Sequence, residues 1–185
     1  MPHIKVDPDL PGIRSLMAFR PETAEPMSKL ANLLLRNNEG LSMADSELIA
    51  TYVSYLNDCF YCQQSHGAIA ACYLNDEALV EAVKENYQHA DIPDKLKALL
   101  AIAGSVQKGG KHVTQEQIER ARELGATDKE IHDTVLIAAA FCMFNRYVDG
   151  LAAHTPTDLL TYGLRAKQVA ERGYGNYIYT EKQPA

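Results

Sequence analysis

The sequence predicts an all-α protein, a multi-helix bundle with one main domain. No stretch of its 185 residues alternates apolar and polar side chains convincingly enough for a β-sheet. Apolar residues instead recur at the three- and four-residue spacing of amphipathic helices, and several of these patterns begin with helix-capping residues. Since 46% of the residues are hydrophobic, the chain can bury a sizeable core. Helix packing on helix is the architecture that these patterns favour.

The beginning of the chain predicts an arm followed by a helix. Residues 1–14 are rich in proline, so they are expected to form an extended N-terminal arm that lies on a neighbour or stays loose, with a short helix starting near Pro11. Residues 24–36 place their apolar side chains on one stripe of a helix. The polar segment 37–40, which ends in glycine, terminates that helix.

The next two helical patterns predict an antiparallel hairpin. They cover residues 44–57 and 59–74, with the turn near position 58. Ser42 opens the first as a capping residue. Asn57 or Asp58 is a suitable N-cap for the second, which would then begin at Cys59.

Capping residues also precede the helices of the second half. A short helix follows Asp76, and a deeply buried one follows the turn around Pro93. Thr114 with Gln117 and Thr127 with Glu130 fit the capping-box pattern, and the second box opens the most apolar helix. The expected domain covers 15–172, including helices over 128–151 and 157–171, and an aromatic tail at 173–185 is expected to dock on another subunit.

Charge and cysteine content exclude several classes of protein. The net charge is −6 and no run of lysine or arginine occurs, which argues against a nucleic-acid partner. Four cysteines are too few for a disulfide scaffold, so a reducing cytoplasm is expected. The first residues lack the pattern of a signal peptide. The longest apolar run, 135–144, is about half of the roughly 20 residues that a bilayer span needs, so no membrane association is expected.

Four chemically reactive side chains fall within the predicted hairpin. Cys59 and Cys62 form a C-x-x-C pair, whose α-carbons in a helical turn would lie roughly 5–5.5 Å apart, within the range of a disulfide. His66 follows Cys62 by four residues and therefore lies on the same helix face. A base beside a thiol produces thiolate near neutral pH, because a free thiol has a pKa of roughly 8.5. Glu47 lies about one turn from His66 across the hairpin, which permits contact.

These residues can form a proton relay and a redox pair. Glu47 would orient and charge His66, and His66 would take a proton from Cys62, leaving Cys59 to resolve the oxidised sulfur. The helix N-terminus favours charge on Cys59, whereas the imidazole favours it on Cys62, so the residues alone leave the attacking sulfur open. Considered without its spacing to the cysteines, Glu47 would more often be a solvated residue in the first turn of a helix. His66 alone would more often be a hydrogen-bonded imidazole than a base.

The spacing Glu47-x11-Cys59-x2-Cys62-x3-His66 resembles the signature of alkylhydroperoxidase D and its peroxidase-related relatives in the carboxymuconolactone decarboxylase-like superfamily. The resemblance implies that Cys62 becomes a sulfenic acid, that Cys59 is proton donor and resolving thiol, and that Glu47 and His66 are the relay. It also implies a helical fold and homo-oligomers, either trimers or hexamers. Tyr61 stands where the founding member has a histidine, a departure that bears on turnover rate and on reductant docking.

The expected function is a thiol-dependent peroxidase for organic hydroperoxides or hydrogen peroxide. It needs no metal, haem or flavin, and an external dithiol or an adaptor protein would reduce its disulfide. Three alternatives remain open: a dithiol electron carrier for another peroxidase, a carboxymuconolactone decarboxylase-like lyase that would not need the cysteines, and a zinc-bound interaction module. For the zinc module the spacings of Cys59, Cys62, His66 and Cys72 do not fit a zinc knuckle.

Other candidate residues have simpler explanations. Cys72 and Cys142 lie in alanine-rich helical patterns and are expected to be small buried hydrophobes. Arg146 and Asp149 belong to a segment, 141–151, that also resembles the peroxidase-related branch. They are expected to form a structural ion pair near a helix end or, alternatively, to line the pocket.

Overall fold

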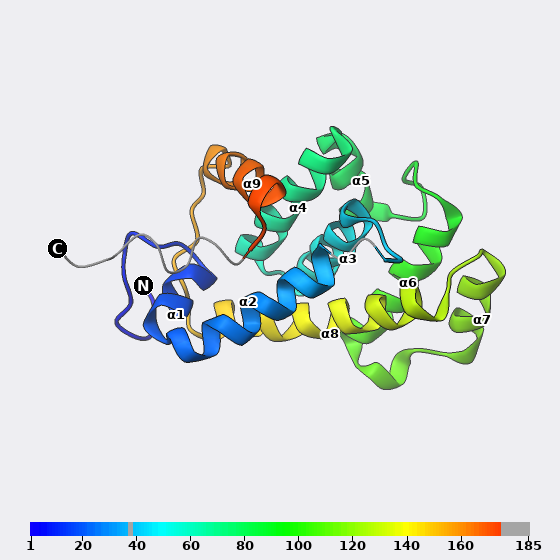
Figure 1. Cartoon of the computed structure of the whole chain (residues 1–185), viewed down its shortest axis with the longest axis horizontal. Coiled ribbons are helices and arrows are strands. Elements are labelled where there is room, and N and C mark those ends of the chain that lie inside the picture. The colour runs from blue at the N-terminus through cyan, green and yellow to red at the C-terminus, as the bar shows by residue number, and fades with distance from the viewer. Residues whose placement is uncertain (37–38, 175–185) are drawn as a thin grey trace.

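A computed structural model of the protein describes residues 1–36 and 39–174. Over this part of the chain it contains nine α-helices, one short 3₁₀ helix and no β-strand, which confirms the all-α prediction (Figure 1). No helix there combines the length and apolar character of a membrane span. The helices are α1 (Ile13–Phe19), α2 (Pro21–Leu35), α3 (Met43–Leu56), α4 (Phe60–Leu74), α5 (Glu77–Asn86), α6 (Asp94–Lys108), η1 (Gly110–His112), α7 (Gln115–Glu123), α8 (Asp128–Gly150) and α9 (Leu160–Arg172).

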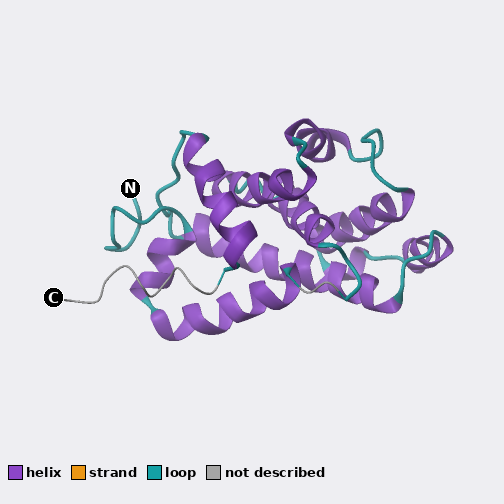
Figure 2. Cartoon of the chain, turned by 45° about the horizontal axis from the view of Figure 1, so that its top comes forward, coloured by secondary structure: helices purple, strands orange, loops and turns teal. Residues whose placement is uncertain are grey.

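The antiparallel hairpin of α3 and α4 lies at the centre of the bundle. Helix α3 contacts α2, α4, α5, α6 and α8, whereas α4 carries α9 and α5 on its other sides. In Figure 1 the long helix α8 runs along the lower side of the bundle, and α7 lies at the opposite end of the molecule from α1. Figure 2 shows the same helices and their connecting loops from a second side. The hairpin is therefore enclosed by elements from both halves of the chain.

The strongly apolar sequences of α3 and α6 agree with their burial in the core. On α3, Leu48, Ile49 and Val53 are almost completely buried, because neighbouring helices cover it on several sides. On α6, Leu99 and Leu100 are fully buried, as the sequence predicts. These side chains belong to one large core cluster that joins α3, α6 and α8.

Four of the predicted capping residues, Ser42, Asp76, Thr114 and Thr127, occupy the ends of their helices. Ser42 accepts a hydrogen bond from the backbone N–H of Asp45, and Asp76 accepts one from that of Leu79. Both threonine capping boxes are complete at the starts of α7 and α8. Each cap satisfies a backbone N–H that has no partner inside its own helix.

Four predicted helix starts differ from the structure by one to three residues. Helix α3 begins at Met43, one residue before the predicted start at 44. Helix α2 begins at Pro21, because proline is well suited to the first position of a helix. Helix α9 begins at Leu160, later than the predicted residue 157. Helix α4 begins at Phe60 with Cys59 as its N-cap. The tight turn requires a left-handed residue, and Asp58, with φ of 56°, takes that conformation instead of capping the helix.

The N-terminal arm packs against its own chain, which corrects the expectation that it lies on a neighbour or stays loose. The backbone N–H of His3 donates to Leu151 O at 3.0 Å, and that of Gly12 donates to His154 O at 2.7 Å. Ile4 and Val6 pack on a hydrophobic cluster that contains both cysteines of the C-x-x-C pair. The arm therefore covers the buried end of the hairpin.

Gly12→Ala is expected to destabilise the fold by about 2–4 kcal/mol. Gly12 has φ of +55°, and a Cβ at this position would lie 2.3 Å from the ring of Tyr61. The ring cannot move away easily, because it is buried and packs against Tyr162. Urea denaturation measures the effect. Gly110→Ala is the matched control, since a Cβ there meets no atom within 4 Å. Equal denaturation midpoints for the two variants would contradict the prediction.

Candidate active site

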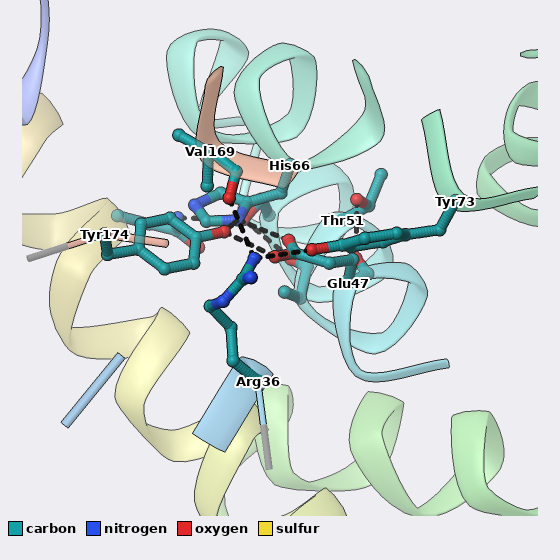
Figure 3. Close-up of polar contacts among 10 residues, drawn as sticks. Arg36, Glu47, Thr51, His66, Tyr73, Val169 and Tyr174 are labelled. Carbon is teal, nitrogen blue, oxygen red and sulfur yellow. Dashed lines mark hydrogen bonds and ion pairs between the residues drawn. The ribbon is translucent and has the colours of Figure 1, made fainter. Parts of the chain in front are cut away.

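Glu47 is the buried centre of the candidate site. It lies on α3 with no exposed surface, so the simpler expectation of a solvated first-turn residue is wrong. Its Oε2 lies 2.8 Å from Nδ1 of His66, and its Oε1 accepts a short hydrogen bond of 2.5 Å from the hydroxyl of Tyr174 (Figure 3). A buried carboxylate needs such partners, because burial without them strongly disfavours its charge.

The hairpin brings His66 into contact with Glu47, which the sequence permits but does not require. The His66 side chain retains 15% of its exposure. Its ring meets the edge of Phe141 at a centroid distance of 4.6 Å and stacks on Tyr174 at 5.8 Å. With Nδ1 held by the carboxylate, the orientation of the imidazole is fixed from three sides.

Tyr174 is a site residue that the sequence analysis missed. Its hydroxyl also lies 3.1 Å from Nδ1 of His66, and its backbone N–H donates to Oδ1 of Asn32 at 2.9 Å. Burial, followed by the Glu47 carboxylate, raises the pKa of Tyr174 well above its ordinary value, so the phenol stays protonated and donates to Glu47. The tail was expected to dock on another subunit, but its first aromatic residue contacts its own chain. Residues 175–185 lie outside the described residues.

Arg36 forms hydrogen bonds with the end of α9, next to the cluster of Glu47, His66 and Tyr174. Its Nη1 donates to the hydroxyl of Tyr73 at 2.7 Å and to the backbone oxygens of Val169 and Ala170 at 2.8 and 3.2 Å (Figure 3). Those carbonyls belong to the last turn of α9, where Val169 O also accepts a hydrogen bond from the backbone N–H of Gly173 at 2.8 Å. Arg36 thereby helps to hold the chain where Tyr174 follows the helix.

The two cysteines of the C-x-x-C pair lie in different surroundings. Both are free thiols, and Cys59 has no exposed surface whereas Cys62 retains 3%. Cys62 and His66 line the same cavity of about 100 Å³, and Cys59 does not line it. The hydrogen bond of Cys59 to Cys62, together with burial, raises the pKa of the Cys59 thiol. Cys59 therefore holds its proton, while Cys62 faces the space that a small molecule can enter.

Asp149 contacts the opposite side of the pair. Burial raises the pKa of its carboxyl, the interaction with the Cys59 side chain opposes this rise, and the nearby Asp58 adds to it. Arg146 donates to the backbone oxygen of Cys142 at 2.9 Å. Among the described residues no ion pair joins Arg146 to Asp149, so the expected structural ion pair is absent there. The two residues line a surface hollow apart from the cavity of Cys62.

A network of amides holds the turn that precedes Cys59. Asn57 Nδ2 donates to Oδ1 of Asn145 at 2.8 Å, and Asn145 Nδ2 donates to the hydroxyl of Ser54 at 3.0 Å. Gln107 Nε2 donates to Oδ1 of Asn57 at 3.0 Å. Three helices therefore fix the position of the turn from which the cysteine pair begins.

The remaining cysteines lie away from the site. Cys72 is exposed in a hollow shared by α4, α5 and α9, so its expected burial is wrong. Cys142 is half-buried and packs against the main core. Residues 1–36 and 39–174 contain no cluster of three or more His, Cys, Asp or Glu side chains that could hold a metal ion.

Together, the fold and the site define a class of helical protein. In it, two thiols lie near a cluster formed by a carboxylate, an imidazole and a phenol. The chain belongs to the Carboxymuconolactone decarboxylase family, whose sequence profile it matches over residues 21–72 and 75–155. Its fold is that of the alkylhydroperoxidase D-like members of this superfamily. A comparison with curated protein sequences finds no match.

Solved structures with this fold include two proteins described as peroxidase-related. One, from Ralstonia eutropha JMP134 and described as an alkylhydroperoxidase AhpD core, is 28% identical with a TM-score of 0.76, covering 85% of this chain and 82% of that one. Another, from Silicibacter sp. TM1040, is 26% identical with a TM-score of 0.75, covering 84% and 80%. An Agrobacterium tumefaciens protein, 19% identical with a TM-score of 0.70 over 85% and 100%, shares the fold.

Proposed function

We propose that this protein reduces hydroperoxides with Cys62 as nucleophile and Cys59 as resolving thiol. The observation that carries the proposal is the arrangement around one cavity. Cys62 and His66 both line it, Glu47 and Tyr174 hold His66 from behind, and Cys59 lies fully buried next to Cys62. A base next to a thiol, with a second thiol within reach, is the arrangement that thiol peroxide chemistry requires.

The cycle uses two thiols and one external reductant. Cys62 thiolate attacks the distal peroxide oxygen, the O–O bond breaks, and the departing alkoxide takes a proton, which leaves a sulfenic acid and an alcohol. Cys59, which has given its proton to the alkoxide, then attacks the sulfenic sulfur as a thiolate. The S–O bond breaks, the departing hydroxide takes the proton held by His66 and leaves as water, and the Cys59–Cys62 disulfide forms. An external dithiol, or an adaptor protein that carries one, reduces this disulfide and is itself oxidised.

Each residue of the cluster has a separate part in this cycle. His66, held by Glu47, takes the proton of Cys62 and so favours the thiolate. The raised pKa of Cys59 keeps a proton available for the alkoxide and delays ionisation of the resolving sulfur. Glu47 and Tyr174 act through His66 and are positioning residues in this proposal.

Steady-state consumption of cumene hydroperoxide with dithiothreitol as the supplied dithiol tests the proposal. We expect turnover by the purified protein, with the Cys59–Cys62 disulfide found by mass spectrometry before reductant is added. Formation and reduction of the disulfide without peroxide turnover would instead support an electron carrier for another peroxidase. Decarboxylation of a muconolactone that survives replacement of both cysteines would support a lyase.

We also propose that the protein works in the cytoplasm as a homo-oligomer, a trimer or a hexamer. Exposed leucines on and beside α9 support an interface between copies, since large apolar side chains on a surface favour association. Sedimentation at micromolar concentration tests the assembly, and a monomer would overturn it. The leucines are Leu159, Leu160 and Leu164.

Tyr174→Phe is expected to lower turnover about 10-fold. The substitution removes the hydrogen bond to the buried Glu47 carboxylate but keeps the ring that stacks on His66. Hydrogen bonds to charged groups contribute about 1.5–3 kcal/mol, which corresponds to a factor of roughly 10 or more. Peroxide turnover and thermal denaturation are measured together. Tyr73→Phe is the matched control, since that hydroxyl bonds Arg36 rather than Glu47. Equal turnover in the two variants would contradict a role for Tyr174.

A further inference from the structure

The cavity beside Cys62 is enclosed mainly by apolar side chains. These come from α1, α2, α4, α8 and α9. The cavity volume of about 100 Å³ approaches the roughly 150 Å³ of a protein cavity that accepts benzene. Several of the lining residues are only half-buried, so the cavity opens to the surface. The space is therefore suited to a compact apolar body. The main apolar lining residues are Met17, Met27, Ile69, Phe141, Phe144 and Val169.

One polar group on these walls is a buried hydroxyl without a partner. Ser28, on α2, lines the cavity and keeps only 5% of its exposure. Its Oγ has no hydrogen-bond partner among the described residues. Buried hydroxyls on helices can bond the carbonyl oxygen four residues earlier, as Thr51 and Ser54 do on α3 at 2.7 and 2.8 Å. Ser28 does not make this bond.

The other hydroxyls on the described walls of the cavity have protein partners. Tyr162 donates to a backbone oxygen at 2.8 Å, and Tyr174 donates to Glu47 at 2.5 Å. The side chains of Tyr61 and Ser65 interact with each other. Because buried polar groups are nearly always satisfied, the hydroxyl of Ser28 is suited to bond a group that enters the cavity.

Ser28 and Cys62 line the cavity from different helices. Helix α2, which carries Ser28, packs on α1, α3 and α8, whereas α4, which carries Cys62, packs on α3, α5 and α9. A molecule in the cavity can therefore present its reactive group to Cys62 while another part of it reaches Ser28.

An unpaired hydroxyl on such a wall discriminates between ligands. A hydroxyl buried without a partner costs stability, and an oxygen atom of a ligand that accepts its hydrogen bond removes this cost. A ligand of the same shape without the oxygen leaves the cost in place. The hydroxyl of Ser28 thus favours ligands that carry an acceptor oxygen.

We propose that Ser28 selects the substrates of this site, and that these are organic hydroperoxides whose compact apolar body carries a neutral acceptor oxygen, such as that of a ketone. The apolar walls hold the body, the Ser28 hydroxyl donates to the acceptor, and the hydroperoxide lies at Cys62. The hydroperoxide group rests on the function proposed above. The acceptor oxygen rests on the cavity and on Ser28 alone.

Acetophenone and α-methylstyrene are a matched pair of ligands, because they differ only by C=O in place of C=CH2. Their binding to the reduced protein is measured by NMR titration. We expect Ser28→Ala to weaken the binding of acetophenone about 10-fold and that of α-methylstyrene less than about 2-fold. An unchanged affinity for acetophenone in Ser28→Ala, or no binding of it to the wild type, overturns the proposal.

Thr134→Val is the matched control for this measurement. Thr134 is fully buried and its hydroxyl also has no partner among the described residues, but it does not line the cavity. The affinity for both ligands should therefore stay at the wild-type value. A loss of acetophenone binding in Thr134→Val as large as that in Ser28→Ala would overturn a specific role for Ser28.

Thermal denaturation without ligand separates selection from a structural role. Ser28→Ala should have a Tm equal to or above that of the wild type, because alanine removes an unsatisfied polar group. A lower Tm would mean that the hydroxyl stabilises the fold itself, and this would overturn the proposal.

The same exchange of C=O for C=CH2 in a substrate tests the hydroperoxide group. Cumene hydroperoxide with a para acetyl group is compared with the para isopropenyl compound. We expect kcat/KM to be about 10-fold higher for the acetyl compound in the wild type, and the ratio to fall to about 1 in Ser28→Ala. Ser28-dependent binding of acetophenone without turnover of either hydroperoxide would support the acceptor site and overturn the proposed peroxidase. Turnover of both hydroperoxides with equal kcat/KM in the wild type would overturn the acceptor site alone.

Discussion

Cys62→Ser is expected to abolish peroxide consumption. Cys62 is the thiol that lines the cavity together with His66, and serine cannot supply an anionic nucleophile near neutral pH. The measurement is steady-state consumption of cumene hydroperoxide with dithiothreitol as reductant. A wild-type rate in this variant would reject the assignment of Cys62.

Substitutions of Cys59 and Cys72 serve as controls for the loss of activity expected in Cys62→Ser. Cys59→Ser should still form a sulfenic acid on Cys62, detected with dimedone by mass spectrometry, but should not form the intramolecular disulfide. Cys72→Ser should turn over like the wild type, because Cys72 is exposed in another hollow. If Cys59→Ser forms no sulfenic acid while Cys62→Ser does, the roles of the two thiols are reversed.

Glu47→Gln is expected to lower turnover about 100-fold. General-base assistance contributes roughly 100- to 10,000-fold, and the neutral amide can no longer stabilise a charged His66. The side chain is fully buried, so water does not replace the lost charge. We expect the pH at which Cys62 becomes reactive toward iodoacetamide to move upward, a change that a purely structural role would not produce.

A second buried glutamate gives the matched control. Glu130 is 5% exposed and pairs with Lys95 at the start of α8, and it belongs to a capping box rather than to the site. Glu130→Gln should lower stability without moving the pH dependence of alkylation. Glu47→Asp, which keeps the charge, should recover part of the activity. An unshifted pH profile in Glu47→Gln would remove Glu47 from the relay.

Local patterns made much of the fold predictable. The serine, aspartate and threonine caps are correct because a cap acts on backbone groups only two or three residues away. The hairpin was predictable because two apolar helical patterns meet at a short polar turn. The start of α4 was not, because Asp58 has the chemistry of a cap but the turn requires it in a left-handed conformation.

The candidate site was predictable only in part. Glu47 and His66 are only 19 residues apart and lie on the two helices of one hairpin, so the sequence indicates that they can meet. Tyr174 is 127 residues from Glu47, and no spacing signal connects a residue of the C-terminal tail to a helix so far away. The contact of Asp149 with Cys59 depends likewise on where α8 passes the hairpin.

The sequence by itself determined the order of the helices, most of their caps and the fixed spacing of two thiols, a carboxylate and an imidazole. These depend on interactions within a few turns of the chain. The tertiary structure decided that Glu47 is fully buried, that the N-terminal arm covers the cysteines, and that Cys62 rather than Cys59 faces the cavity. Those outcomes depend on packing between distant segments, whose geometry local patterns do not specify.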